Sequence, residues 1–189
     1  MIYLASQSPR RRQLLEQIGV EYGSVDVDVP EVRAPHEPPQ DYVSRVAREK
    51  AGAGLLALSG VPGAVVLGAD TEVVLDDEVF GKPRDAAHAT AMLARLSGRT
   101  HRVISAVWCL SAGREEQLVN LNDVTFAALS PDEIARYVAS GEPMGRAGAY
   151  AVQGRAAAFI RELRGSYSGV MGLPLFETAA LLRRFGVAA

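Results

Sequence analysis

The chain has 189 residues, of which 48% are hydrophobic and 22% are charged. This length and composition allow one sizeable buried core and are ordinary for a soluble globular protein. The 20 basic and 22 acidic residues give a formal net charge of −2, without the basic excess that is typical of nucleic-acid-binding proteins. The charge balance therefore argues against a nucleic-acid partner, and any phosphate recognition requires a local cluster of cations.

Cysteine content and the amino-terminal sequence exclude further classes. Cys109 is the only cysteine, so an internal disulfide and a cysteine-based zinc site are excluded, and its apolar neighbours predict a buried thiol. The three histidines, His36, His88 and His101, are scattered, which predicts neither a metal ligand nor a base. The apolar start, residues 1–5, is too short for a signal peptide or a membrane span. We therefore expect a cytoplasmic protein without a membrane partner.

The predicted elements alternate between strands and helices along the chain. In order, they are a strand at 2–5, a helix from 9 to about 18, a strand at 22–29, a helix from 40 to about 58, a strand at 64–68, a hairpin of 71–75 and 78–80, a helix at 85–96, strands at 100–111 and 117–127, a helix from 130 to about 140, a strand at 157–163 and a helix at 174–185. This order predicts an α/β architecture with long, partly antiparallel strands and helices outside.

The segment from Ser6 to Arg12 is the first candidate phosphate site. A short strand leads into a helix start, where unpaired N–H groups and the helix dipole favour an anion. Ser8 stands at the capping position, and Arg10 and Arg11 add guanidinium donors for phosphate oxygens. The alternative is a capped helix with a solvated basic first turn, although cations oppose the dipole at that end. On this segment alone, both interpretations stay open.

Lys50 is the second candidate, on the predicted 40–58 helix. Val43 and Gly54 share its face at helical spacing, whereas Arg45 falls on the opposite face. A lysine in the middle of an apolar stripe either extends outward to water or reaches an internal anion. The position of Lys50 in the stripe favours the internal anion.

Two more candidates follow the predicted strand at 64–68. Asp70 stands just past its end, where a carboxylate can hold Mg²⁺ or orient an attacking water, although a lone Asp more often makes turn hydrogen bonds. Lys82 precedes a proline and does not match a P-loop. These residues, the arginines after Ser8 and the carboxylate of Glu31 together fit a polyphosphate site, because burying a triphosphate requires cations and usually Mg²⁺.

Six motifs in matching order resemble the Maf-like nucleoside triphosphate pyrophosphatases, from residue 2 to about residue 185. They are Leu4-Ala5-Ser6-Gln7-Ser8-Pro9-Arg10-Arg11, Ala47-Arg48-Glu49-Lys50-Ala51, Gly68-Ala69-Asp70-Thr71, Gly81-Lys82-Pro83, Leu96-Ser97-Gly98-x-Thr100-His101 and Val170-x-Gly172-Leu173-Pro174-Leu175. The resemblance implies one domain over residues 1–189, with an elongated, bent mixed β-sheet flanked by helices and two lobes around a cleft, related to the inosine triphosphate pyrophosphatases. It also implies a divalent metal, Mg²⁺ or Mn²⁺, and a homodimer.

The resemblance assigns roles to individual residues of this chain. It makes Asp70 the proton acceptor and places Glu31 in the polar active-site set, and we expect the carboxylates of both residues to bind the metal. It places four residues in the phosphate-binding set: Ser8, Arg11, Lys50 and Lys82. The substrate that it implies is a nucleoside triphosphate, cut between the α- and β-phosphates.

Three positions distinguish the branches of this family and indicate the base. Arg10, Thr71 and Gln153 resemble the residues of the dTTP/UTP branch at these positions. The 7-methyl-GTP branch is identified by Trp, Gln and Glu at the same three positions. A thymine or uracil edge offers an acceptor oxygen beside an N–H donor, and the amide of Gln153 can match both. A wrong base would leave buried polar groups unpaired, which discriminates strongly.

We therefore expect hydrolysis of dTTP and UTP to the monophosphate and pyrophosphate, in nucleotide-pool housekeeping and with a link to cell-division arrest. One alternative is the same reaction on another nucleotide, such as 7-methyl-GTP or a modified pyrimidine triphosphate. Another is a nucleotide-sensing interaction protein, since the family is also associated with inhibition of septum formation. A sensor would bind triphosphate without turning it over.

Overall fold

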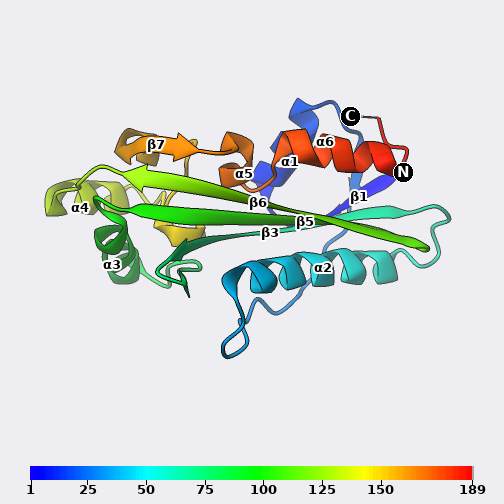
Figure 1. Cartoon of the computed structure of the whole chain (residues 1–189), viewed down its shortest axis with the longest axis horizontal. Coiled ribbons are helices and arrows are strands. Elements are labelled where there is room, and N and C mark those ends of the chain that lie inside the picture. The colour runs from blue at the N-terminus through cyan, green and yellow to red at the C-terminus, as the bar shows by residue number, and fades with distance from the viewer. Residues whose placement is uncertain (189) are drawn as a thin grey trace. The chain divides into compact units, whose positions relative to one another are not determined.

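The computed structural model describes residues 1–188 and contains a seven-stranded mixed sheet (Figure 1). Its strand order is β2-β1-β3-β5-β6-β7, and β4 pairs with β3. The strands are β1 Ile2–Ala5, β2 Tyr22–Ser24, β3 Val65–Leu75, β4 Glu78–Val79, β5 Thr100–Ser111, β6 Arg114–Phe126 and β7 Ile160–Arg164. The helices are α1 Pro9–Gln17, α2 Pro39–Ala57, α3 Ala86–Leu96, α4 Pro131–Ala139, α5 Tyr167–Met171 and α6 Leu175–Arg184, with 3₁₀ turns η1 Ala147–Ala149 and η2 Arg155–Phe159.

The chain divides into two compact units, each built from separate segments. The first unit comprises Met1–Asp70, Ser105–Asn120 and the chain from Gly172 onward; the second comprises Thr71–Ile104 and Leu121–Met171. Strand β1 pairs in parallel with β2 and β3, whereas β4 and β7 pair antiparallel with their neighbours. The predicted α/β class with a mixed sheet and flanking helices is confirmed. That residues 1–189 act as one domain stays a prediction.

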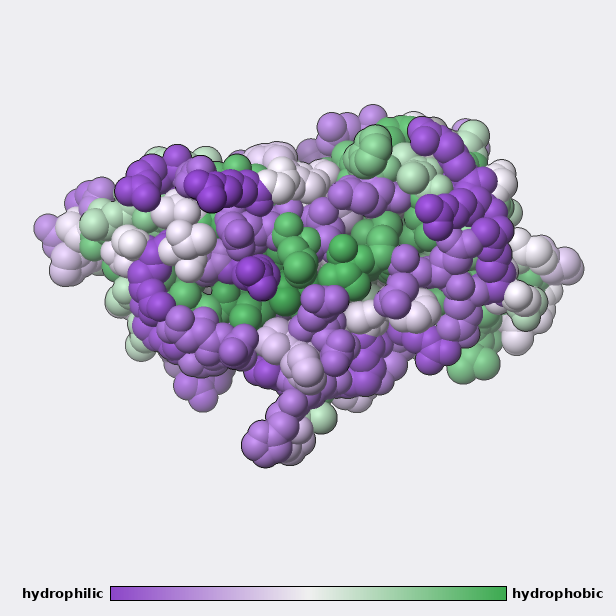
Figure 2. Space-filling model, viewed as in Figure 1, coloured by the Kyte–Doolittle hydropathy of each residue, from purple (hydrophilic) through white to green (hydrophobic). Residues whose placement is uncertain are grey.

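In the first unit, helices cover both faces of the sheet, as the alternation along β6 shows. Odd positions face α2, because Glu115 pairs with Arg48 and Gln117 accepts a hydrogen bond from Ser44. Even positions face α6, because Asn120 donates to Glu177 at 3.0 Å. The charged residues of α2 other than Lys50 are exposed or half-buried, and Figure 2 shows hydrophilic residues over α2 and the loop before it. This arrangement places the inner side of α2 directly against the sheet.

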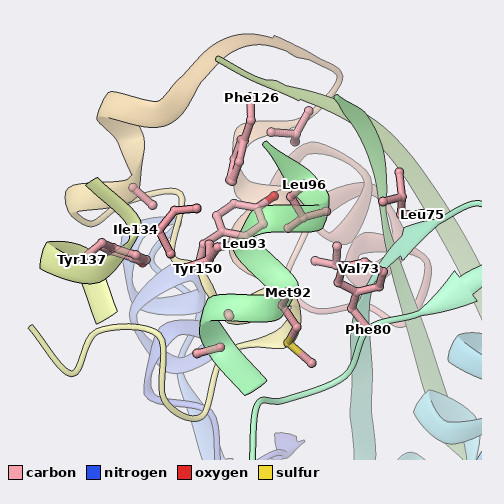
Figure 3. Close-up of a cluster of buried hydrophobic side chains, with 14 of the residues drawn as sticks. Val73, Leu75, Phe80, Met92, Leu93, Leu96, Phe126, Ile134, Tyr137 and Tyr150 are labelled. Carbon is pink, nitrogen blue, oxygen red and sulfur yellow. The ribbon is translucent and has the colours of Figure 1, made fainter. Parts of the chain in front are cut away.

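The second unit has its own hydrophobic core between α3, α4 and the strands (Figure 3). Met92, Leu93 and Leu96 of α3 pack there against side chains from β3 and β6. His101 is 1% exposed in this unit, and its Nε2 lies 2.8 Å from the hydroxyl oxygen of Tyr150. Burial lowers the pKa of His101 to about 4, so the ring is neutral at neutral pH. The ring of His101 packs edge to face against the rings of Phe126 and Tyr150.

Four predicted element boundaries are wrong. The strand predicted at 117–127 is β6, which begins three residues earlier, at Arg114. Strand β3 is continuous from Val65 to Leu75, so Asp70 lies inside a strand and not past its end, because backbone pairing continues through polar side chains. Strand β2 spans 22–24 and not 22–29, because its partner β1 pairs only from Ile2 to Leu4. The strand predicted at 157–163 starts only at Ile160, as β7. The residues before it form η2, because its alanines have a low propensity for strands.

Several local predictions are confirmed. Cys109 is fully buried, and burial raises the pKa of its thiol to about 12. The helix at 40–58 is α2, displaced by one residue at each end. The helix predicted from 130 to about 140 is α4, and Ser130 and Glu133 form a reciprocal cap at its start. None of the helices within residues 1–188 combines the length and apolar character needed to cross a membrane.

Candidate active site

Two glycines allow α2 to pack directly on β3. A Cβ atom at Gly68 would lie 2.4 Å from the carbonyl oxygen of Ala47 and 2.5 Å from the backbone nitrogen of Ala51. On the helix side, a Cβ at Gly54 would lie 2.9 Å from a methyl carbon of Val66. No larger residue fits either position at this spacing, so the glycines set how closely the helix and the strand approach each other.

This close approach brings Lys50 to Asp70. Gly68 and Asp70 are two residues apart in β3 and share the strand face that α2 covers. Lys50 Nζ donates to Asp70 Oδ1 at 2.8 Å, and its second acceptor is Glu31 Oε1 at 2.6 Å. The side chains of Lys50 and Asp70 are 10% and 7% exposed, whereas Glu31 is 33% exposed. The prediction that Lys50 reaches an internal anion is confirmed.

The cluster of Glu31, Lys50 and Asp70 has properties that fit a divalent cation. One lysine faces two carboxylates in a partly buried place. Asp70 Oδ2 is buried and has no hydrogen-bond partner within residues 1–188. The described chain contains no group of three or more metal-ligating side chains. Mg²⁺ commonly binds through one or two carboxylates, with waters and substrate phosphates completing its shell, so Asp70 and Glu31 suit that ion.

The hydrogen bonds at the start of α1 differ from those that the sequence predicts. Ser8 is the N-cap residue, but its hydroxyl does not cap the helix; its backbone N–H donates instead to Ser6 Oγ at 3.2 Å. Arg11 is 8% exposed and turns inward, donating through Nη1 to Ser6 Oγ and through Nε to the carbonyl oxygen of Gly172 at 2.9 Å. The alternative of a solvated basic turn is therefore wrong for Arg11, whose guanidinium links α1 to the start of the last segment.

The remaining predicted residues divide between the two units. Arg10 and Ser8 are half-buried at the start of α1, in the same unit as Asp70. Thr71, Lys82 and Gln153 belong to the second unit, where Lys82 and Gln153 are exposed. The structure thus brings Lys50 into contact with both Glu31 and Asp70. The joint site of all nine predicted residues stays a prediction.

Some of the residues that support the site belong to a sequence motif, and others do not. Ser6 belongs to the Ser-x-Ser motif, and its role as the acceptor for Arg11 follows from the tight turn before α1. Glu142 accepts hydrogen bonds from the backbone of Arg155 and Ala156, across a turn that contains Gln153. No periodicity or motif links position 142 to position 155, so sequence reasoning missed this contact.

The fold and the site define a mixed α/β protein with a buried lysine between two carboxylates, one of which has an oxygen left for a cation or a water. The chain belongs to the Maf-like protein family, whose match covers residues 1–185. This confirms the resemblance that the six motifs indicated.

Curated relatives match the chain over nearly its whole length. It is 57% identical over 188 residues to the "dTTP/UTP pyrophosphatase" of Xanthomonas campestris pv. campestris, covering 98% of this chain and 99% of the relative. It is also 57% identical over 186 residues to the "Nucleoside triphosphate pyrophosphatase" of Xylella fastidiosa, covering 98% of each chain. Among solved structures, the Ham1 protein of Staphylococcus aureus aligns with 67% of this chain and 71% of its own, at 13% identity and a TM-score of 0.45.

Proposed function

We propose that this chain is a nucleoside triphosphate pyrophosphatase that hydrolyses dTTP and UTP to the nucleoside monophosphate and pyrophosphate. The observation that carries the proposal is the contact of Lys50 with both Asp70 and Glu31 at a buried position. The names and full-length identity of the Xanthomonas and Xylella relatives support the same activity.

In this proposal, the carboxylate of Asp70 is the proton acceptor. A water oxygen attacks the α-phosphorus, its proton passes to Asp70, and the bond between the α-phosphorus and the bridging oxygen breaks to release pyrophosphate. Lys50 holds Asp70 by its Oδ1, which fixes the orientation of the carboxylate before substrate arrives. Its charge, with those of Arg11 and Lys82, offsets the negative charge that grows on pyrophosphate. Ser8 adds a hydroxyl to the phosphate-binding set.

Asp70 and Glu31 would hold the divalent metal, Mg²⁺ or Mn²⁺. The buried Oδ2 of Asp70, which has no hydrogen-bond partner among the described residues 1–188, supports this assignment. When bound, the ion supplies a Lewis acid that neutralises the phosphate oxygens. Lys50 contacts both carboxylates, which holds them near each other.

The base is read by Arg10, Thr71 and Gln153 in this proposal. The amide of Gln153 offers a donor and an acceptor, which matches the adjacent acceptor and donor of a thymine or uracil edge. The exposed position of Gln153 leaves its amide accessible to a ligand. We extend the proposal to a homodimer in the cytoplasm, acting in nucleotide-pool housekeeping with a link to cell-division arrest; analytical ultracentrifugation tests the dimer.

A panel of nucleoside triphosphates with pyrophosphate detection tests the proposal. The purified chain with Mg²⁺ or Mn²⁺ should release pyrophosphate from dTTP and UTP at least about tenfold faster than from GTP or 7-methyl-GTP, because a mismatched base leaves buried polar groups unpaired. Equal turnover of all nucleotides would reject the proposal that the site distinguishes between bases. Binding of dTTP without turnover would contradict the enzymatic function and favour a nucleotide sensor.

A further inference from the structure

The turn that carries Gln153 is held on both sides by two side chains from a neighbouring segment. Before Gln153, the backbone N–H of Ala151 donates to the hydroxyl oxygen of Tyr137 at 3.3 Å. After it, the N–H groups of Arg155 and Ala156 donate to the two carboxylate oxygens of Glu142, at 3.1 and 3.4 Å. All these residues belong to the second unit. The backbone on either side of Gln153 is therefore anchored to the same short segment.

The two anchoring side chains also hold each other. The hydroxyl of Tyr137 donates to Glu142 Oε1 at 2.8 Å while its oxygen accepts from Ala151. Tyr137 is 3% exposed, and its ring packs in the core of the second unit, edge to face with Phe159 at 5.2 Å (Figure 3). The ring is thus fixed by packing, and the hydroxyl and Glu142 are fixed through it.

The charge of Glu142 is maintained by the same contacts. Burial raises the pKa of this carboxyl, but the hydrogen bonds from Arg155, Tyr137 and Ala156 outweigh burial, and the pKa is lowered from its usual value. A carboxylate is the only side-chain group that accepts on both oxygens without a donor of its own. Glutamine at position 142 would direct an N–H group toward a backbone N–H and lose one of these bonds.

The residue after Gln153 is adapted to this contact. A Cβ atom at Gly154 would lie 2.3–2.6 Å from the carboxylate atoms of Glu142, so no side chain fits between the turn and the carboxylate. The N–H of Gly154 also donates to the carbonyl oxygen of Ala151 at 3.0 Å, which closes the turn under Gln153. The chain thus leaves Gln153 exposed at the tip of a turn whose backbone is bonded at 151, 154, 155 and 156.

We propose that Glu142 and Tyr137 are positioning residues for Gln153, and that they set base discrimination by fixing the turn from 151 to 156. This inference rests on the proposed function, in which Gln153 contacts the base. Neither side chain touches the nucleotide; they act by holding the amide of Gln153 at one orientation, so that a pyrimidine with matching donors and acceptors is favoured. Loosening the turn costs discrimination, because a mobile amide can adjust to a mismatched base.

The test compares Glu142→Gln and Tyr137→Phe with the wild-type chain in steady-state hydrolysis of dTTP, UTP and CTP. Glu133→Gln is the matched control, because Glu133 is also a carboxylate that accepts a backbone N–H in the second unit, at the cap of α4. We expect Glu142→Gln to reduce the ratio of kcat/KM for dTTP over CTP by at least about fivefold, mainly through KM for dTTP. The control should keep the wild-type ratio. Tyr137→Phe, which keeps the ring, should give a smaller change in the same direction.

Hydrogen–deuterium exchange of the turn supplies a readout that does not depend on turnover. At least one of the amides of Arg155 and Ala156 should exchange at least about tenfold faster in Glu142→Gln, whereas both should exchange at the wild-type rate in Glu133→Gln. The inference is overturned if Gln153→Glu changes discrimination while Glu142→Gln, with faster exchange, does not. If Gln153→Glu leaves the substrate profile unchanged, the base-reading proposal itself fails, and the role of Glu142 in discrimination fails with it.

Discussion

Lys50 Nζ lies 2.8 Å from Asp70 Oδ1, at a place where both side chains are about nine-tenths buried. The pair joins the middle of α2 to the middle of β3, and Glu31 completes it from the loop before α2. A buried ion pair contributes little net stability, since desolvation offsets the attraction, but it is costly to break on one side only. Its value here is the fixed orientation that it gives to the carboxylate of Asp70.

Replacement of Lys50 by Met should destabilise the chain and abolish pyrophosphate release. The substitution leaves the buried carboxylate of Asp70 without its cation, which costs about 3 kcal/mol of the free energy of unfolding. Urea unfolding measures the loss. The double variant Lys50→Met/Asp70→Asn removes the uncompensated charge and should recover a substantial part of it. Additive losses in the double variant would show that the two side chains are not coupled.

Gly68→Ala should separate α2 from β3 and reduce both stability and activity. The added methyl group would meet the backbone of Ala47 and Ala51, and overpacking of this kind costs about 1–3 kcal/mol. Gly52→Ala on α2 is the control, because a Cβ there meets no atom within 4 Å. That control should stabilise α2 by up to about 1 kcal/mol and leave turnover intact. Thermal melting and pyrophosphate assays of both variants check this, and equal effects would contradict the account of the close approach.

Arg11→Lys should weaken the link between α1 and the segment after Gly172. A lysine keeps the charge but cannot donate from two fixed nitrogens to Ser6 and Gly172 at once, so we expect a loss of about 1–3 kcal/mol in the free energy of unfolding. Arg12→Lys changes a neighbouring arginine whose Nη2 donates to Gln7 on the exposed side, and it should stay within about 0.5 kcal/mol of the wild type. A comparable loss in both variants would reject a special role for Arg11.

His101 should make the stability of the chain depend on pH below neutrality. The unfolded imidazole titrates near 6.5, whereas burial lowers its pKa in the folded chain to about 4. Between these values the unfolded state binds more protons, so the free energy of unfolding falls as the pH drops from 6.5 to 4, by about 3 kcal/mol from this residue. His101→Gln should show a flatter dependence over this window in urea unfolding. The same slope in both proteins would contradict the buried, neutral ring.

The periodicity of apolar residues correctly predicted that Lys50 lies on the inner side of its helix. The prediction that Asp70 stands past the end of a strand was wrong, and strand pairing explains why. The apolar stripe of α2 is a local pattern, so the sequence was sufficient to place Lys50 inside. The continuation of β3 through Asp70 depends on hydrogen bonds to neighbouring strands, which residue types do not encode. The contact of Glu142 with the turn around Gln153 is a tertiary contact without a spacing rule. Local geometry was therefore predictable from the sequence, whereas contacts between distant segments required the structure.

The measurement that tests the central claim most directly is pyrophosphate release from dTTP by Asp70→Asn, with Asp123→Asn as the control. Asparagine keeps the shape of the side chain but cannot take a proton from water, so we predict a loss of at least about 1,000-fold in kcat with a cooperative unfolding transition retained. Asp123 contributes to an exposed ion pair with Arg102 at 3.5 Å, and its variant should turn over at the wild-type rate. Turnover by Asp70→Asn within tenfold of the wild-type rate would contradict the assignment of Asp70 as the proton acceptor.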